Sequence, residues 1–474
     1  MSAPCPSVRK RRSAPARIRA TLAAFVLLPA CAGEPARPNL LLLITVDTLR
    51  ADRLGAFGSS LGLTPNLDAL AARSEVFTAA YSSAPFTLPS VAAMMTGASP
   101  EELGIVDNES VLQETFPTLA SILWERGWTT RGIVGNFILR HSSGIDRGFE
   151  QFDDDFGQFE AVRKLPERVA VFTTEGALSG LDQCSAAPAT RCFIWVHYQD
   201  PHGPYTAPGE ILDAELERGI EPPVPNPNVP LSKDHLGVGG LPTYQVLGDH
   251  RDAAYYVAAY HAEIRYVDRE IGRLLDGLAT RGLDASSVIA FSSDHGEGLG
   301  EDDYWFAHGE YLSDALVRVP LMIRVPGRPP AVRTDVAALT DLPKTLLSAV
   351  GATAPVPPLA GRDLLGDGAE NSESRPYMAN LIGATGIRFG IVEGEYKLVI
   401  TMRDGVWDGR LTRRGRDAID LAGAAPQVAA PMRKHLKQIR ARVSQGPSEV
   451  RQDLSTQDRD ALRALGYLES AEGR

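Results

Sequence analysis

The chain has 474 residues, of which 44% are hydrophobic and 23% are charged, and its formal net charge at pH 7 is -11. Such a length accommodates one large domain with additions, or two domains. The negative charge argues against a nucleic-acid-binding protein, which normally presents a basic surface. It does not exclude an anionic substrate, because the local field of a cleft can oppose the net charge.

Residues 1–31 have the order of an export signal: a basic stretch, an apolar run from Ala20 to Leu28, and then Pro-Ala-Cys. The apolar run is too short to span a bilayer, and no later segment is apolar enough to do so. The sequence Leu28-Pro29-Ala30-Cys31 resembles a bacterial lipobox, in which Cys31 is acylated; the alternative is an ordinary cleaved signal peptide. We therefore expect a signal peptide over 1–31. We expect an exported protein of the bacterial cell envelope, periplasmic or an outer-membrane lipoprotein, that contacts the membrane only through this lipid.

Five apolar runs predict buried parallel strands, because they do not alternate with polar residues as half-exposed strands do. Helical patterns lie between them, and alternating strands and helices indicate an α/β domain with a mainly parallel central sheet flanked by helices. We place this domain at 38–352. The predicted strands are Asn39–Val46, Thr129–Val134, Phe193–Val196, Val288–Phe291 and Pro320–Val325. The predicted helices include Pro65–Arg73, Phe116–Arg126 and Ala253–Leu278.

Two cysteines remain once Cys5 and Cys31 are assigned to the N-terminal segment. Cys184 and Cys192 flank a short loop rich in Ser, Ala and Pro, and an oxidising compartment would let them form a disulfide. Two free thiols are the alternative. The disulfide agrees better with export.

A Pro-rich stretch lies within a long insertion at 203–252, which is a candidate lid or substrate-selecting loop. A second one, at 353–358, is typical of a linker. The runs 389–392 and 396–401 that follow predict a hairpin. We expect a small C-terminal antiparallel subdomain at 359–440 and a charged tail at 441–474.

Polar residues follow three of the predicted strands directly. In an open α/β sheet, ligands bind beyond the carboxyl ends of the strands. A single Asp at such a position is often a turn or cap residue, but carboxylates and imidazoles delivered by three strands to one edge indicate a divalent metal site. These residues are Asp47 after the first strand, His197, Asp200 and His202 after the third, and Asp294 and His295 after the fourth.

Thr87 precedes a run of small residues that suits a helix, with Pro89 in its first turn and Gly97 at its end. Free amides at a helix N-terminus favour an anion. Thr87 is then either a plain helix cap or, beside a metal, a hydroxyl that can ionise and attack.

Five motifs in order resemble the sulfatase family of the alkaline phosphatase superfamily, over about Asn39 to Val325. Each motif alone is weak, but their order is specific. They are Val46-Asp47-Thr48-Leu49-Arg50-Ala51-Asp52, Thr64-Pro65-Asn66-Leu67-Asp68, Pro89-Ser90 through Thr96-Gly97, Asp200-Pro201-His202-Gly203-Pro204-Tyr205, and Ser293-Asp294-His295-Gly296-Glu297 with Arg318-Val319-Pro320-Leu321.

The resemblance implies a large α/β fold with a smaller C-terminal sheet and one divalent metal ion (Ca, Mn, Mg or Zn). Its ligands would be Asp47, Thr87, Asp294 and His295, with His202 near the leaving group. A second metal using Asp200 and His202 is possible, although His202 cannot be both a ligand and a free acid.

The departures from the family pattern bear on mechanism. Sulfatases carry Cys or Ser where Thr87 stands and convert it to formylglycine, whereas oxidation of Thr would give a ketone. The Arg of that motif is Val91 here. The family's Lys and His correspond to Asn136 and Ile138, and His308 stands nearest a late Lys. Several positions that would hold a sulfate group are therefore uncharged.

An esterified Thr cannot be released by collapse to an aldehyde, so water must attack the central atom. Phosphorus accepts this attack readily in Thr- and Ser-nucleophile relatives. We therefore expect Thr87 to attack an anionic ester, with His202 or His308 protonating the leaving group. Arg50 orients Asp47, contacts substrate or forms a structural ion pair. His197 contacts substrate or supports the ligands, and Asn136 contacts substrate.

The sequence predicts an exported, metal-dependent hydrolase of phosphate or sulfate esters, with a phosphodiester-type substrate favoured. The substrate is a small molecule, a glycan or a lipid headgroup, and no nucleic-acid partner is expected. One alternative is a sulfatase that works without formylglycine. The other is a non-catalytic relative that binds an anionic ester.

Overall fold

The computed structural model describes residue 1 and residues 38–159, 166–233, 236–352, 361–366, 376–417, 419–444, 446–456 and 458–459. The chain divides into two units, Met1–Ala36 and Arg37–Arg474, and the fold below is that of the second. Residues 2–37 and 353–360 lie outside the described residues, and with them the predicted signal peptide, Cys31 and the linker. In the described part of the chain, no helix combines the length and the apolar character needed to cross a membrane.

An eight-stranded sheet forms the centre of the molecule. All neighbouring pairs are parallel except those that involve β11, which is antiparallel to both β9 and β2. This confirms the predicted α/β fold with a mainly parallel sheet. In spatial order the strands are β12 Ala331–Arg333, β2 Glu75–Phe77, β11 Leu321–Arg324, β9 Ser287–Ser293, β1 Leu40–Val46, β8 Cys192–Tyr198, β4 Thr129–Val134 and β5 Gln151–Asp153.

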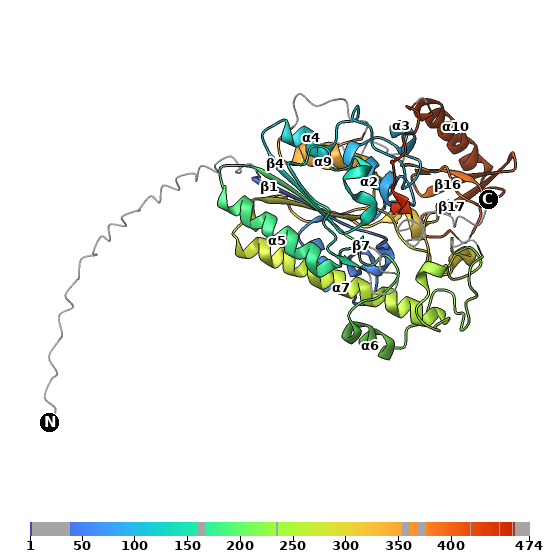
Figure 1. Cartoon of the computed structure of the whole chain (residues 1–474), viewed down its shortest axis with the longest axis horizontal. Coiled ribbons are helices and arrows are strands. Elements are labelled where there is room, and N and C mark those ends of the chain that lie inside the picture. The colour runs from blue at the N-terminus through green and yellow to red at the C-terminus, as the bar shows by residue number, and fades with distance from the viewer. Residues whose placement is uncertain are drawn as a thin grey trace. The chain divides into compact units, whose positions relative to one another are not determined.

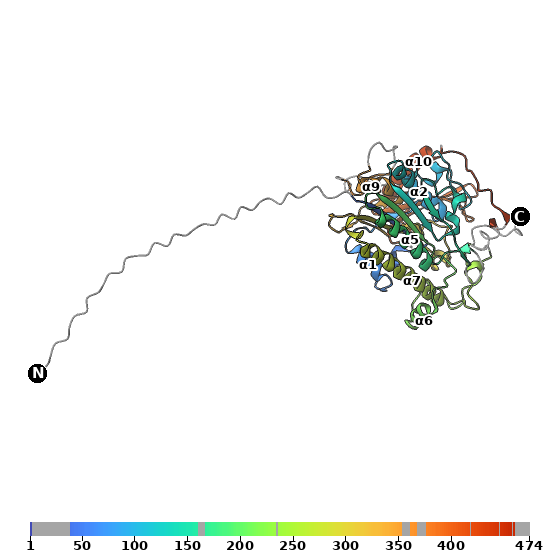
Figure 2. The same ribbon diagram turned by 60° about the vertical axis from the view of Figure 1, so that its left-hand side comes forward.

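Helices cover both faces of this sheet, which explains why its strands are apolar throughout. Alternate residues of β1 enter two separate cores: Leu41 and Leu43 pack on one face, and Leu40 and Leu42 on the other. Figures 1 and 2 show α5 and α7 on one side of the sheet and α2, α4 and α9 on the other. On the first side α1 also contributes to the core.

The α-helices are close to those expected. The helix predicted at 116–126 is shorter, because Thr118 caps it at its N-terminus. Their bounds are α1 Pro65–Ala71, α2 Thr87–Thr96, α3 Pro100–Leu103, α4 Leu119–Trp124, α5 Ala170–Ala186, α6 Gly209–Glu217, α7 Ala253–Thr280, α8 Asp314–Val317, α9 Leu342–Ala349 and α10 Pro426–Val443.

Two details of the predicted strands are wrong. The run Pro320–Val325 was expected to be parallel, but β11 is antiparallel, since apolar content carries no information on strand direction. The third strand was expected to end at Val196, but β8 continues to Tyr198, so His197 lies inside the strand rather than after it. Its side chain is buried there.

Smaller sheets surround the central one. A three-stranded sheet has the order β10 Arg318–Val319, β3 Ala80–Tyr81 and β13 Ala337–Ala338, and a two-stranded one pairs β6 Gln158–Phe159 with β7 Pro166–Glu167. The C-terminal sheet is antiparallel, with α10 packed on it. Its strands are β14 Tyr377–Asn380, β15 Ile387–Glu393, β16 Tyr396–Arg403 and β17 Val406–Arg413. The predicted hairpin is confirmed: Glu393 pairs with Tyr396 around Gly394.

Cys184, near the end of α5, and Cys192, at the start of β8, form a disulfide with their Cα atoms 6.1 Å apart. The bond joins a helix to the central sheet at the edge opposite the carboxyl ends of the parallel strands.

Candidate active and metal site

Two neighbouring strands end side by side and deliver the acidic residues of the site. β1 ends at Val46 and β9 at Ser293, and these residues are register partners in the parallel ladder. The residues that follow, Asp47 on one strand and Asp294 and His295 on the other, are therefore neighbours at the carboxyl edge of the sheet. All three are fully buried.

One ligand atom from each of Asp47, Asp294 and His295 lies within 4.8 Å of the others. The Nε2 atom of His295 is 3.6 Å from Asp47 Oδ1 and 3.5 Å from Asp294 Oδ2. Both oxygens are buried and accept no hydrogen bond from the described residues. Buried carboxylate oxygens without partners are costly, and a divalent cation would satisfy them. Carboxylate and imidazole donors suit the cations named above, so these residues fit the metal that the sequence predicts.

The imidazole of His295 is set for metal binding by its own backbone. Its Nδ1 lies 3.0 Å from the carbonyl oxygen of Gly296, which can only accept a hydrogen bond. Nδ1 therefore carries the proton, and the Nε2 lone pair faces the two carboxylates. Burial and the neighbouring His308 lower the pKa of His295 to about 3, so the ring is neutral and able to coordinate at pH 7.

The two carboxylates oppose each other electrostatically. Burial and the charge of Asp47 raise the pKa of Asp294 well above its ordinary value. Burial also raises the pKa of Asp47, but the nearby imidazoles of His197, His202 and His295 outweigh this, so the net shift is downward. Without a cation, the proton that relieves the repulsion therefore resides on Asp294.

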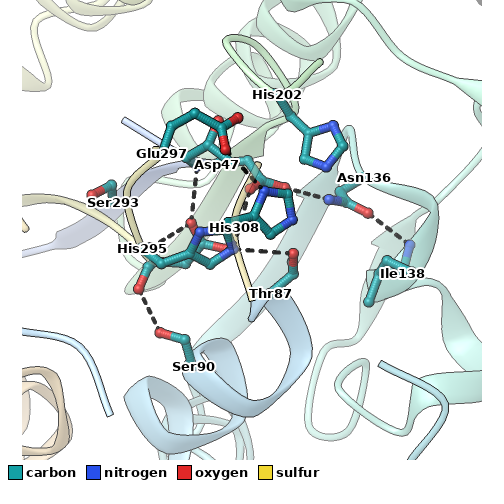
Figure 3. Close-up of polar contacts among 12 residues, drawn as sticks. Asp47, Thr87, Ser90, Asn136, Ile138, His202, Ser293, His295, Glu297 and His308 are labelled. Carbon is teal, nitrogen blue, oxygen red and sulfur yellow. Dashed lines mark hydrogen bonds and ion pairs between the residues drawn. The ribbon is translucent and has the colours of Figure 1, made fainter. Parts of the chain in front are cut away.

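Thr87 is the first residue of α2 and is fully buried. Its Oγ1 lies 3.5 Å from His295 Nε2, and Figure 3 shows the hydroxyl pointing at that ring. The helix is held at this end by two contacts. The Asn108 Oδ1 accepts a hydrogen bond from the Leu88 amide at 2.9 Å, and Ser90 donates to the carbonyl of Asp294 at 2.7 Å.

The other oxygen of Asp47 has polar partners. Asn136 donates from its side-chain amide to Asp47 Oδ2, and His197 Nε2 lies 3.9 Å from the same atom. The Nδ1 of His197 contacts the hydroxyl of Thr45 at 2.8 Å, which orients the ring inside β8. Both residues therefore stand beside a metal-ligand candidate, and a substrate contact by either stays a prediction.

His202 and His308 lie on the same side of the site as His295. Their ring centroids are 5.0 Å apart, and those of His308 and His295 are 4.6 Å apart (Figure 3). The Nδ1 of His202 is 2.7 Å from the carbonyl of Gly203, so Nδ1 carries the proton. The Nδ1 of His308 lies 3.3 Å from a carboxylate oxygen of Glu297.

Arg50 is buried against acidic groups of its own surroundings. Its guanidinium donates to Asp52 at 2.8 and 2.9 Å, to Glu301 at 2.8 Å and to the carbonyl of Glu297 at 3.1 Å. This arrangement is the structural ion pair that was one of the three interpretations of Arg50. A substrate contact stays a prediction.

Two positions that carry charged or basic side chains in typical sulfatases are part of the core here. Val91 on α2 and Ile138 are both fully buried. They pack in the apolar core on the side of the sheet that α4 and α9 cover. Together with Asn136 they leave the site poor in cations.

Three residues that organise this site were not predicted from the sequence. Glu297 is fully buried and holds both His308 and the hydroxyl of Tyr205, which donates to it at 3.1 Å. Its position two residues after His295 in the same motif was the available signal. Ser90 and Asn108 gave no signal, because their roles depend on distant backbone groups.

The insertion at 203–252 packs beside these residues. The ring of Tyr244 stacks on that of His202 with centroids 6.4 Å apart, and the amide of Trp305 donates to the carbonyl of Gly237 at 2.9 Å. It is therefore adjacent to the site, and its action as a lid stays a prediction.

Curated relatives are sulfatases. The chain is 27% identical over 336 residues to iduronate 2-sulfatase of Homo sapiens, covering 60% of this chain and 60% of that protein. It is 29% identical over 357 residues to choline-sulfatase of Rhizobium meliloti, covering 66% and 68%. The chain thus spans about three-fifths of the length of the human relative.

Solved structures share the fold. BT4656, in complex with its substrate D-glucosamine-2-N,6-O-disulfate, aligns with a TM-score of 0.71 at 17% identity over 86% of this chain and 98% of that chain. The phosphonate monoester hydrolase of Silicibacter pomeroyi aligns with a TM-score of 0.68 at 20% identity over 85% and 95%. The model of the family described as Sulfatase matches residues 39–352, which is more than half of the chain, so the protein belongs to the sulfatase family.

Proposed function

We propose that this protein is a metal-dependent hydrolase that cleaves a singly charged phosphoester, of the phosphodiester type, through the hydroxyl of Thr87. The observation that carries the proposal is the position of Thr87 Oγ1, 3.5 Å from His295 Nε2 at the edge of the Asp47, Asp294 and His295 cluster. Its position in the first turn of α2 adds the positive end of the helix dipole, where an ester anion binds favourably.

The charge of the site supports a substrate with one negative charge. Asp47 and Asp294 already bring two carboxylates, and the positions of Val91, Asn136 and Ile138 bring no cation. A phosphate monoester carries close to two charges at pH 7 and would meet stronger repulsion than a diester or a phosphonate monoester. The fold is shared with the phosphonate monoester hydrolase of Silicibacter pomeroyi.

Asp47, Asp294 and His295 would hold the divalent cation, with Thr87 beside them. When bound, the cation supplies positive charge that favours ionisation of the Thr87 hydroxyl and neutralises a nonbridging oxygen of the ester. The chain itself contributes the orientation of these ligands, through the Gly296 carbonyl behind His295 and the Asn136 amide behind Asp47.

The chemistry proceeds in two displacements at phosphorus. Thr87 Oγ1 forms a bond to phosphorus as the bond to the leaving alcohol breaks, and an imidazolium donates its proton to that alcohol. We assign this step to His308, whose Nδ1 contacts a carboxylate oxygen of Glu297 at 3.3 Å. The proton that Thr87 loses in this displacement passes to solvent. A water then attacks phosphorus and gives a proton to the neutral imidazole, while the bond from phosphorus to Thr87 Oγ1 breaks and that oxygen takes a proton from solvent.

A second candidate is hydrolysis of a sulfate ester without formylglycine. The relatives iduronate 2-sulfatase and choline-sulfatase favour it, and BT4656 binds a sulfated glucosamine. Under either candidate we propose a small-molecule, glycan or lipid-headgroup ester as substrate. We also propose export to the cell envelope with Cys31 as a lipid-anchored N-terminus. Mass spectrometry of the mature N-terminus of wild type and Cys31→Ser tests the anchor, and an unmodified, uncleaved N-terminus contradicts it.

The deciding experiment is a turnover panel on metal-supplemented protein with nitrophenyl esters of sulfate, phosphate, a phosphodiester and a phosphonate. Thr87→Val removes only the hydroxyl at nearly constant volume, and Thr87→Ser retains it as a matched control. We expect diester or phosphonate turnover in wild type and in Thr87→Ser, and its loss in Thr87→Val. Turnover that survives in Thr87→Val overturns the assignment of Thr87 as the nucleophile. Cleavage of the sulfate ester alone establishes the second candidate function.

A further inference from the structure

A cavity of about 370 Å³ lies between the three-stranded sheet of β3 and β10 and the end of the C-terminal sheet, and no residue of the candidate active site lines it. Pockets of this size accommodate small ligands. The residues that line it and carry polar chemistry are Tyr81, Arg318, Glu395, Arg413, Arg414 and Arg416. None of them has a role in the proposed reaction.

A tight turn after β17 assembles three of the arginines. The amide of Arg416 donates to the carbonyl of Arg413 at 2.9 Å, and the amide of Arg414 donates to the carbonyl of Glu395 at 3.0 Å. Gly415 has φ +71°, a conformation that favours glycine. Its amide donates to a carboxylate oxygen of Asp314, which anchors the turn on the body of the protein.

The arginines of this turn are exposed or half-buried, and the acids Asp314 and Asp417 lie close enough to Tyr81 to act on it electrostatically. Among the described residues, no carboxylate oxygen lies within 4.0 Å of the guanidinium groups of Arg413, Arg414 or Arg416. The guanidinium of Arg318 donates to a neutral group, the carbonyl of Thr78, at 2.9 and 3.1 Å. Glu395 is the one acid in the lining, against four arginines. Such an excess attracts an anion.

Two buried donors at the cavity lack acceptors. The hydroxyl of Tyr81, a residue that is 1% exposed, and the Nε of Arg414 are both buried, and neither has a hydrogen-bond partner in the part of the chain that the structure describes. Unsatisfied buried polar atoms are rare and costly. An oxyanion in the cavity would accept from both.

We propose that this cavity binds a sulfate or phosphate group, free in solution or carried on an anionic polysaccharide, at a site separate from the metal cluster. The planar guanidinium groups of Arg413, Arg414 and Arg416 suit the paired oxygens of such a group. Tyr81 adds a buried neutral donor that selects an acceptor. This inference stands without the proposed function, because none of its residues belongs to the active site.

The test is isothermal titration calorimetry on the full chain stripped of metal with EDTA, using sodium sulfate, sodium phosphate and a polysulfated polysaccharide as probes. The variants are Arg414→Gln, which removes charge and the orphaned Nε donor, and Tyr81→Phe, which removes only the hydroxyl. Arg442→Gln on α10 is the matched control, since that exposed arginine does not line the cavity. Thermal melts verify that each variant is folded.

We expect one saturable site that weakens by about tenfold or more in Arg414→Gln and by a smaller factor in Tyr81→Phe, and that is unchanged in Arg442→Gln. Binding of sodium sulfate or phosphate means that the site takes a free anion, and binding of the polysaccharide alone means that it takes an anion carried on a polymer. Both results support the site. Absence of binding by every probe, or equal binding in the folded Arg414→Gln protein, overturns the proposal.

Discussion

Two clusters of buried charge in this molecule differ in whether the protein satisfies them. In the C-terminal region, the Lys397 ammonium lies 2.6 Å from Asp314 and 2.7 Å from Asp417. The remaining carboxylate oxygens are also used: Asp314 accepts from the Gly415 amide, and Asp417 accepts from the Thr412 hydroxyl at 3.0 Å. This cluster, the Lys397 network, is complete within the protein.

The metal cluster of Asp47, Asp294 and His295 is more deeply buried than the Lys397 network, yet it is incomplete. It combines two carboxylates with an imidazole that is neutral, and one oxygen of each carboxylate has no partner among the described residues. Burial of charge alone therefore does not mark a functional site, since the ammonium of Lys397 is also buried. A functional site is instead marked by the unpaired carboxylate oxygens and the excess of negative charge, because both require a bound cation that the protein does not itself supply.

The largest effect is expected from a substitution that breaks the metal cluster. Asp294→Asn should lower turnover by at least about 1000-fold, which corresponds to about 4 kcal/mol, because the cation loses a carboxylate ligand. The same change should leave the metal-stripped protein as stable as wild type or more stable, since it removes one of two buried carboxylates that repel each other. Metal content, turnover and thermal melts with and without EDTA measure these effects.

Wild type should melt at a higher temperature when metal is added, and Asp294→Asn should not. If Asp294→Asn strongly destabilises the metal-stripped protein, the cluster is structural and the contrast with the Lys397 network fails.

Breaking the Lys397 network should have the opposite result: lower folding stability with unchanged turnover. Lys397→Met should lower the free energy of unfolding by about 3–5 kcal/mol, because it leaves two carboxylates buried without their cation. Turnover per folded molecule should be unchanged. Urea unfolding measures the first and active-site titration the second. Lys437→Met, on the exposed side of α10, is the matched control and should change stability by less than about 0.5 kcal/mol.

A smaller effect is expected where the active site depends on a neighbouring loop. Asn108→Ala removes the acceptor of the Leu88 amide, one residue after Thr87, and should lower kcat about tenfold with little change in KM. Asn39→Ala, at an exposed position just before β1 and at the opposite end of that strand from Asp47, is the control. A rise in KM with unchanged kcat would instead mean that Asn108 acts on substrate binding and does not position Thr87.

Much of the fold and most of the site follow from local patterns in the sequence. The central strands are apolar because both their faces are covered, and the ligands stand directly after them, so Asp47, Asp294 and His295 could be found without a structure. Thr87 could be placed at a helix start from Pro89 and Gly97. The rules that place these residues act over a few positions of the chain.

What could not be predicted depends on contacts between distant segments. The direction of β11 is set by its neighbours β9 and β2, which its own residues do not encode. Lys397 and Asp314 are 83 residues apart, and an isolated lysine in a strand is normally interpreted as exposed. Arg414 likewise gives no sign in the sequence that its turn closes a cavity against Tyr81.

The smallest expected effect concerns the loss of folding stability at acidic pH. Burial raises the pKa of Asp417, but Lys397 and the hydrogen bonds outweigh it, so the net shift is below the ordinary value of 3.8. A carboxyl whose folded pKa is lowered stabilises the protein above its unfolded pKa and loses that contribution as the pH falls through the folded pKa. Asp417→Asn should therefore be less stable than wild type by about 1 kcal/mol at pH 7, and the gap should narrow below about pH 4. Urea titrations of metal-stripped protein at pH 7, 5 and 3.5 measure the gap. A gap that stays constant or widens on acidification would mean that Asp417 does not contribute through its charge, and the Lys397 network would then be held mainly by Asp314.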